Sequence, residues 1–198
     1  MEKYEIVRIS GKPDWDKIMP AIVSNYQWQD RMDIAMEARI CHDGEYLYLQ
    51  LRAWEENIRA EHTELLGMVC EDSCMEFFFR PEKDDLRYFN FEINPNGIMF
   101  IGFGSGKENL VRLAPDAALF NPQTERFEGG WSAEYSIPAA FIRVFFPEFA
   151  LDAGKILRAN LYKCGHRTVQ PHYITWNKVN SGIPSFHRPE DFGAMILG

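Results

Sequence analysis

The chain has 198 residues, of which 46% are hydrophobic and 25% are charged, and its formal net charge is −8 at pH 7. These proportions are typical of a folded globular protein and exclude a disordered chain, so we expect a single domain over residues 1–198. The acidic balance excludes nucleic acid and anionic membranes as partners, and no apolar run is long enough to predict a membrane-spanning segment. Residues 1–10 lack a basic stretch followed by an apolar one, so we predict no signal peptide and expect a cytoplasmic protein.

Turn signals rich in Gly, Pro and Asn divide the chain into short segments, most of which alternate apolar and polar residues with a period of two. In chain order, the predicted strands are 4–9, 34–40, 46–54, 74–80, 88–94, 98–103, 131–137, 156–163, 173–176 and 194–197. Two short helices are predicted, one over 14–22 and one over 139–146. Many strands and few helices predict an all-β fold, a two-sheet antiparallel β-sandwich of the jelly-roll or immunoglobulin-like kind.

The alternation assigns one face of each strand to a common core. In 46–54, 74–80 and 88–94 the odd-numbered positions carry nearly all the aliphatic and phenylalanine side chains that such a core needs. The predicted core therefore includes Leu47, Leu49, Phe77, Phe79, Phe89, Phe91, Leu157 and Leu161.

The opposite strand faces combine carboxylates, amides, guanidinium groups and tyrosine rings. They carry Tyr48, Gln50, Arg52, Glu76, Asn90, Glu92, Asn94, Arg158, Asn160 and Tyr162. Paired donors and acceptors beside aromatic planes suit a neutral ligand rich in hydroxyl groups. An ordinary solvated face, or a partly buried polar network, is the alternative interpretation of the same residues.

Five segments, in order along the chain, resemble the strand motifs of family 9-type carbohydrate-binding modules. They are 71–79 (EDSCMEFFF), 88–94 (YFNFEIN), 131–138 (WSAEYSIP), 158–162 (RANLY) and 187–193 (HRPEDFG). The resemblance implies a β-sandwich that binds sugars, often at a chain end, between two aromatic side chains. It also implies a binding module rather than an enzyme.

The resemblance places specific residues at the sugar. Trp176 matches one of the two clamping aromatics, and Glu76 matches the residue that bonds sugar hydroxyls. The second aromatic is expected just before the Asp-Ser pair, where this chain has Cys70, so we expect a one-sided platform, a different ligand, or a substitute such as Trp54. The predicted carbohydrate-binding residues are Trp176, Glu76, Arg158, Asn90, Glu92 and Tyr162.

Two other functions stay open. Glu76 and Glu92 fall on the same kind of strand face, and a suitably spaced carboxylate pair could hydrolyse a glycosidic bond. Exposed strand edges could instead pair with a protein partner or a second copy of the chain. No catalytic residue is predicted, and the expected partner is a saccharide.

Metal binding has little support in the sequence. The resemblance leaves a structural calcium ion as a candidate cofactor, but the acidic clusters, Asp30 with Asp33 and Asp84 with Asp85, lack a full set of ligands at calcium spacing. The four cysteines, at 41, 70, 74 and 164, form no CxxC pair and have no histidine at zinc-ligand spacing. We therefore predict reduced, mostly buried thiols and no metal ligands.

Overall fold

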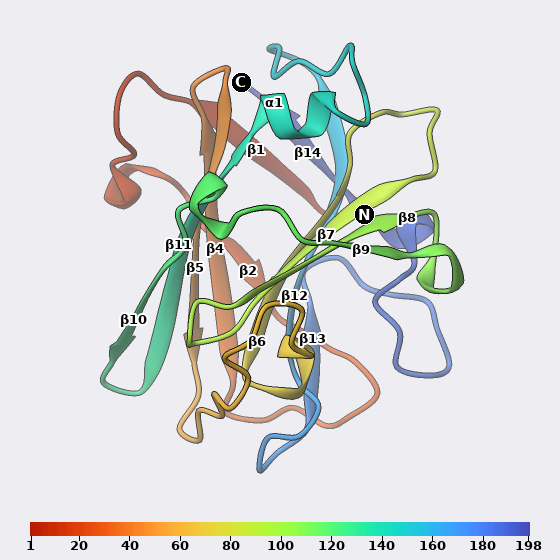
Figure 1. Ribbon diagram of the computed structural model, residues 1–198. Coiled ribbons are helices and arrows are strands. Elements are labelled where there is room, and N and C mark those ends of the chain that lie inside the picture. The colour runs from red at the N-terminus through yellow and green to blue at the C-terminus, as the bar shows by residue number, and fades with distance from the viewer.

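The computed structural model describes residues 1–198 and shows a mostly β protein with one short α-helix (Figure 1). All ten predicted strands are present, with ends that shift by no more than two residues. They are β1 (Lys3–Arg8), β4 (Ala35–His42), β5 (Tyr46–Trp54), β6 (Cys74–Arg80), β7 (Tyr88–Ile93), β8 (Met99–Gly104), β11 (Gly130–Pro138), β12 (Ile156–Gly165), β13 (His172–Thr175) and β14 (Gly193–Leu197). The alternation of apolar and polar residues is therefore a reliable signal in this chain.

Four strands were not predicted, and three of them are too short to show a period. They are β2 (Ala21–Val23), β3 (Asn25–Tyr26), β9 (Val111–Leu113) and β10 (Gln123–Phe127). Each lies along a longer neighbour: β2 pairs with β4, β3 with β13, β9 with β8 and β10 with β11. Their conformation therefore depends on pairing rather than on a pattern of their own.

The helices are shorter than predicted. The helix α1 (Ala139–Arg143) starts after Pro138 as expected but ends three residues early. The helix predicted over 14–22 is wrong, because that segment holds only a 3₁₀ turn, Trp15–Lys17, followed by β2. Pro20 accounts for the difference, since proline inside a helix removes a hydrogen bond and clashes with the preceding turn. No helix of the structure has the length and apolar character needed to cross a membrane.

The strands form one large, curled, mixed sheet rather than two separate ones. Its main path runs β10-β11-β5-β4-β1-β14-β12-β6-β7-β8-β9. The junction is β1, whose residues from Lys3 to Ile6 pair in parallel with β14 and whose Val7 and Arg8 pair in parallel with β4. The prediction of two separate antiparallel sheets is therefore wrong, because β1 belongs to both halves and pairs in parallel with both of its neighbours (Figure 1).

The core fills the inside of the curl. Thirty-eight buried residues form one hydrophobic cluster, and all eight predicted core residues belong to it. Phe77, Phe79, Phe89 and Phe91 are fully buried, and their rings lie 5.1–6.1 Å apart, centroid to centroid. Burial of such large aromatic side chains is a major source of stability.

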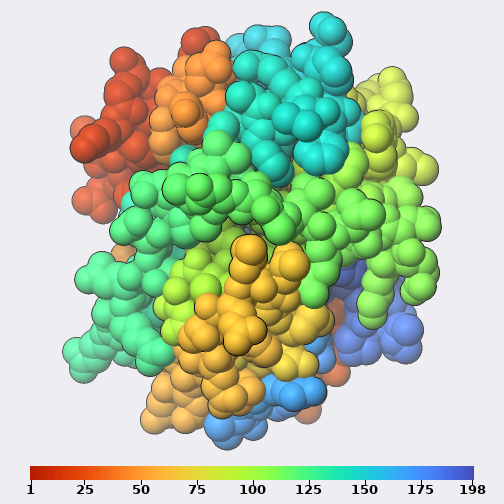
Figure 2. All heavy atoms as spheres, in the orientation of Figure 1, coloured from red at the N-terminus to blue at the C-terminus, as the bar shows by residue number.

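The other face of β6, β7 and β12 is buried as well, in agreement with the partly buried polar network considered as an alternative above. A second hydrophobic cluster of ten residues lies on this face. It includes Phe78, Tyr88 and Tyr162 from the strands, and Phe186 and Phe192 from the segment near the C-terminus that covers them. Long connecting segments complete the cover: Figure 2 shows the chain around residues 60–70 packed against the chain around residues 105–115 on one side of the molecule. The polar strand face is therefore open only where this cover is incomplete.

The Asp-Ser pair of the 71–79 motif organises a loop. The Asp72 carboxylate is fully buried and accepts hydrogen bonds from the backbone N–H groups of Glu61 and His62 and from Nδ2 of Asn94, at 2.9–3.0 Å. The Ser73 hydroxyl accepts from the backbone N–H of Arg59 at 3.1 Å. Part of the family resemblance thus reflects the architecture of the loop before β6.

Candidate functional site

A cavity of about 480 Å³ opens where the cover over β6, β7 and β8 is incomplete. Its apolar and aromatic lining comes from Met68, Phe100, Leu110, Tyr173, Pro184 and Phe186. Its polar lining comes from Cys70, Glu76, Lys107, Glu92, Arg112, His166, Ser185 and His187. Apolar walls with a few converging polar groups, in a volume of this order, are typical of small-molecule sites.

Two carboxyl groups line the cavity from neighbouring strands. Glu76 on β6 and Glu92 on β7 stand directly opposite each other in the antiparallel register, and only 2% and 6% of their surfaces are exposed. The Nδ2 group of Asn90 donates to Oε1 of Glu92 at 2.7 Å, and the Cys164 thiol donates to Oε1 of Glu76 at 2.9 Å. Each carboxyl group is therefore held in place by a buried neighbour.

Burial dominates the protonation of this pair. It raises the pKa of Glu92 to about 7, although the hydrogen bond from Asn90 and the charge of Arg112 act in the opposite direction. Burial, and then the negative charge of Glu92, raise the pKa of Glu76 well above its ordinary value. Near neutral pH the pair therefore carries fewer than two negative charges, so it offers both donors and acceptors to a ligand.

Glycine on the adjacent strand makes room for this arrangement. A Cβ atom added to Gly102 of β8 would lie 2.1 Å from Oδ1 of Asn90, which is far inside contact distance. Gly102 pairs directly with Asn90 across the two strands. Any larger residue at position 102 would therefore displace the amide that orients Glu92.

Aromatic rings form part of the cavity wall. Tyr173 of β13 is half-buried and has Trp28 at 5.8 Å and His166 at 5.2 Å, measured between ring centroids. Phe100 of β8 pairs with Glu92 in register and lies 4.4 Å from the guanidinium carbon of Arg112. The wall thus presents a tyrosine ring and a phenylalanine ring near the carboxyl pair.

Basic and imidazole groups complete the lining. Nη2 of Arg112 donates to the backbone carbonyls of Leu66 and Gly67, which fixes the guanidinium group beside the cavity. Burial lowers the pKa of His187 to about 4, so this imidazole is neutral at pH 7 and its Nδ1 accepts from the hydroxyl of Tyr88 at 2.7 Å. Arg112 therefore brings a permanent positive charge to the site, whereas His187 brings none.

Four of the six predicted sugar-binding residues lie together. Glu76 and Glu92 line the cavity, and Asn90 is fully buried behind Glu92. Tyr162 is also fully buried, stacked on Phe186 at 4.1 Å between ring centroids, so it supports the wall without reaching the cavity.

Trp176 and Arg158 lie outside this cavity. Trp176 is only 4% exposed and belongs to the main core, so it cannot serve as an exposed stacking platform. Tyr173 pairs with Cys164, whose face borders the cavity, and Trp176 lies three positions further on and therefore faces the opposite side. Arg158 lies near the start of β12, where its Nη1 contacts the sulfur of Met1.

Trp54, considered as a substitute for the second aromatic, is also outside the cavity. It ends β5 in the other half of the sheet, where it packs edge-on against Phe127 at 6.1 Å between ring centroids. Cys70, in contrast, does line the cavity, at the position where the resemblance places an aromatic residue. Tyr173, which was not among the predicted site residues, is the partly exposed aromatic that lines the cavity. Its alternation with Ile174, a core residue of the same strand, is the sequence signal that could have indicated it.

In one of the acidic clusters considered for calcium, Asp85 pairs with a neighbouring arginine. The Asp85 carboxylate accepts hydrogen bonds from the backbone N–H and the guanidinium group of Arg87, and the guanidinium group holds its pKa below the ordinary value. The one group of three or more His, Cys, Asp and Glu side chains whose ligand atoms lie close together is Cys74, Glu76 and Cys164. Its two thiols are not ligands that calcium prefers.

The curled sheet with its lined cavity defines a β-sheet binding module. Residues 12–197 match the family described as Carbohydrate-binding family 9, and the chain belongs to that family. The family consists of non-catalytic binding modules. Among curated proteins, none matches the chain.

Solved structures show the same fold. A candidate carbohydrate-binding protein from Bacteroides uniformis is 27% identical, with a TM-score of 0.85 over 100% of this chain and 98% of that one. A family 9 module from Caldicellulosiruptor kristjanssonii in complex with glucose is 14% identical, with a TM-score of 0.71 over 100% and 96% of the two chains. A family 9 module from the same organism in complex with cellotriose is 15% identical, with a TM-score of 0.70 over 99% and 93%. At these last two identities the likeness concerns the fold alone.

Proposed function

We propose that the cavity binds a mono- or oligosaccharide, with Glu76 and Glu92 bonding its hydroxyl groups and Tyr173 stacking on the apolar face of a sugar ring. The observation that carries the proposal is the buried carboxyl pair, opposed in register, in a cavity that also holds a partly exposed tyrosine. Membership in Carbohydrate-binding family 9 supports the ligand class.

Hydrogen bonding favours a ligand rich in hydroxyl groups. A sugar hydroxyl both donates and accepts, and carboxyl oxygens, the guanidinium group of Arg112 and the ammonium group of Lys107 together supply both functions. Because Asn90 and Cys164 already hold one oxygen of each carboxyl group, the second oxygen of each is the one available to a ligand. Asn90 and Tyr162 then act as positioning residues.

The proposed aromatic contact is one-sided, because Cys70, which lines the cavity, occupies the position where the resemblance places the second aromatic. A single platform buries less of the ring than a clamp does, so the contact surface is smaller. We therefore expect dissociation constants nearer millimolar than micromolar, which corresponds to about 4 rather than about 8 kcal/mol.

Calorimetric titration and ligand-observed NMR with glucose, cellotriose and a panel of other mono- and oligosaccharides test the proposal. At least one sugar should bind the wild-type protein, and Tyr173→Ala should weaken that binding about tenfold or more, because the stacking surface is lost. Trp54→Ala is the matched control: it removes a partly exposed aromatic outside the cavity and should leave binding unchanged.

Two results would contradict the proposal. One is that no saccharide binds at millimolar concentration, and the other is that Tyr173→Ala binds as tightly as the wild type. Product analysis after incubation with cellotriose separates binding from the alternative activity, since release of shorter sugars would favour hydrolysis by the carboxyl pair.

A further inference from the structure

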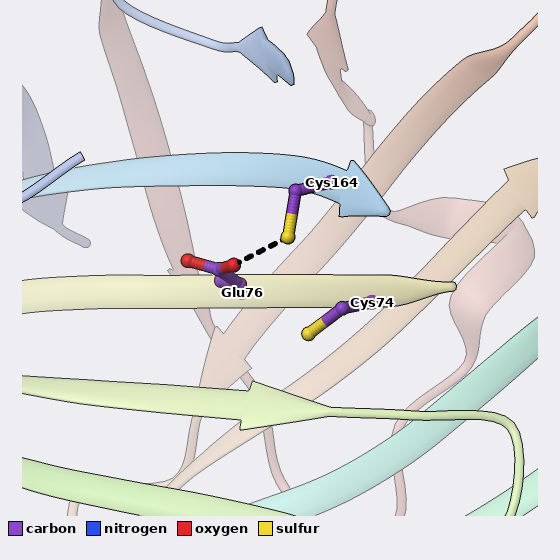
Figure 3. A group of neighbouring side chains, drawn as sticks. All are labelled: Cys74, Glu76 and Cys164. Atoms are coloured by element: carbon purple, nitrogen blue, oxygen red, sulfur yellow. Dashed lines mark hydrogen bonds between the residues drawn. The ribbon is translucent and has the colours of Figure 1, made fainter. Parts of the chain in front are cut away.

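Three ionisable side chains form a buried cluster beside the cavity. Cys74 and Glu76 lie on β6 and Cys164 lies on β12, and their ligand atoms are all within 4.8 Å of one another (Figure 3). The two cysteines stand directly opposite each other in the antiparallel register, and Glu76 follows two residues after Cys74, so it points to the same side of the sheet. The sheet register thus places Cys164, from a strand distant in sequence, beside two ligands of β6.

The cluster lacks a cation in contact with it. The nearest buried cation on the same strand, Lys163, points to the other side of the sheet, where its ammonium group lies 3.0 Å from Oε1 of Glu55 and 2.8 Å from Nε2 of His172. Within the cluster, the Cys164 thiol donates a hydrogen bond to Glu76. Burial raises the pKa of Cys74 to about 12, since a thiolate there would have no compensating charge.

We infer that Cys74, Glu76 and Cys164 form a binding site for a thiophilic divalent cation such as Zn²⁺. Two thiolates and a carboxylate are ligands that Zn²⁺ accepts, and a bound cation supplies the positive charge that the buried cluster lacks. Thiolate ligands exclude Ca²⁺ and Mg²⁺, which prefer oxygen. The site is therefore distinct from any structural calcium site.

The geometry is close to what such an ion requires. Tetrahedral ligands at about 2.3 Å from zinc are separated from one another by roughly 3.8 Å. Side-chain rotations that move the ligand atoms by less than about 1 Å therefore close the cluster around an ion. Glu76 also lines the cavity, so a water molecule from the cavity can occupy the fourth position. The thiols give up their protons when the ion binds, and binding should tighten as pH rises.

Cobalt titration tests the site without any sugar. Reduced, chelator-treated protein should develop thiolate-to-cobalt charge-transfer absorption and tetrahedral d–d bands when Co²⁺ is added, and Zn²⁺ should abolish both by displacing it. Cys164→Ser should weaken Co²⁺ binding by about 100-fold or more, because a thiolate ligand is lost. Cys41→Ser is the matched control, since Cys41 is a buried thiol on β4 in the other half of the sheet and should leave the spectrum unchanged.

Circular dichroism establishes that each variant is folded. If Cys164→Ser does not fold, the nearly isosteric Glu76→Gln decides, with an expected loss of about tenfold in Co²⁺ affinity. The inference is overturned if the reduced wild type shows no charge-transfer band. It is also overturned if the deciding variant binds Co²⁺ as tightly as the wild type.

Discussion

Glu76 and Glu92 are buried carboxyl groups, and their burial makes the stability of the folded protein depend on pH. The unfolded chain ionises Glu92 near its ordinary pKa of 4.5, whereas the folded chain keeps it protonated up to about pH 7. Between these two values the folded state binds more protons than the unfolded state, so stability falls as pH rises. The neighbouring Glu76 acts in the same direction, because its pKa is also raised.

Substitution of Glu92 by Gln should remove the part of this pH dependence that comes from Glu92. The free energy of unfolding of the wild type, measured relative to Glu92→Gln, should fall by about 3 kcal/mol between about pH 4 and pH 8, because one pKa unit corresponds to about 1.4 kcal/mol. Urea denaturation in the presence of a chelator, followed by circular dichroism across this range, provides the measurement. The difference between the two proteins isolates Glu92 and its effect on Glu76, since His172 and His187, whose pKa values are lowered, are common to both. A difference that stays flat with pH would show that the pair is fully ionised in the folded protein.

At the scale of elements, a buried ion pair joins the two halves of the sheet. The ammonium group of Lys163 on β12 bonds Glu55, the residue after β5, and Glu55 also accepts from Nε1 of Trp131 at 2.7 Å and from the Ser73 hydroxyl at 2.8 Å. Burial alone would raise the pKa of Glu55, but Lys163 and these hydrogen bonds bring it below its ordinary value. Burial and, to a smaller extent, the positive charge of Lys163 lower the pKa of His172 to about 3. The neutral imidazole therefore accepts a hydrogen bond from the Lys163 ammonium group.

Lys163→Met should destabilise the protein strongly. It leaves the Glu55 carboxylate buried without its partner, and breaking a buried pair in this way costs about 3–5 kcal/mol. The control is Lys155→Met, which breaks the pair between Lys155 and Glu82 at the surface and should cost less than about 1 kcal/mol. Urea denaturation of the two variants gives the comparison. Equal losses would mean that the buried pair contributes no more than the surface pair does.

At the scale of the whole molecule, β1 makes the two halves one structure. Its backbone pairs with β14 along one part of its length and with β4 along the rest, and the side chain of Ile6 is fully buried in the common core. We therefore predict that the chain unfolds as a single cooperative unit, as expected for one domain over residues 1–198.

Ile6→Ala tests this prediction at the junction. It should lower the free energy of unfolding by about 2–5 kcal/mol, as large-to-small changes in a core do. Glu5→Ala, at the exposed neighbouring position on the same strand, should change it by less than about 0.5 kcal/mol. Far-UV and near-UV circular dichroism should show coincident transitions in both variants. Two separate transitions would show instead that the halves fold independently.

Local alternation was enough to predict ten of the fourteen strands and the core, because the side-chain period of a strand is a property of the segment itself. It placed Phe77 and Phe91 inside and put Glu76 and Glu92 together on the other face, where the structure finds them opposed. The family resemblance, too, was carried by short motifs within single strands. All of this information is present in segments of about ten residues.

Only the tertiary structure decided which segments cover the polar face of β6, β7 and β12 and where the cavity opens. Of the cavity lining, Arg112 lies on β9, and Lys107, His166 and Phe186 lie on three separate connections. These segments meet because long-range strand pairing brings them together. Trp176 lies on the opposite side of the sheet from Tyr173, and its ring therefore points into the core rather than into the cavity. The shared strand β1, which turns an expected sandwich into one curled sheet, likewise depends on pairing with the last strand of the chain, and no local pattern encodes that contact.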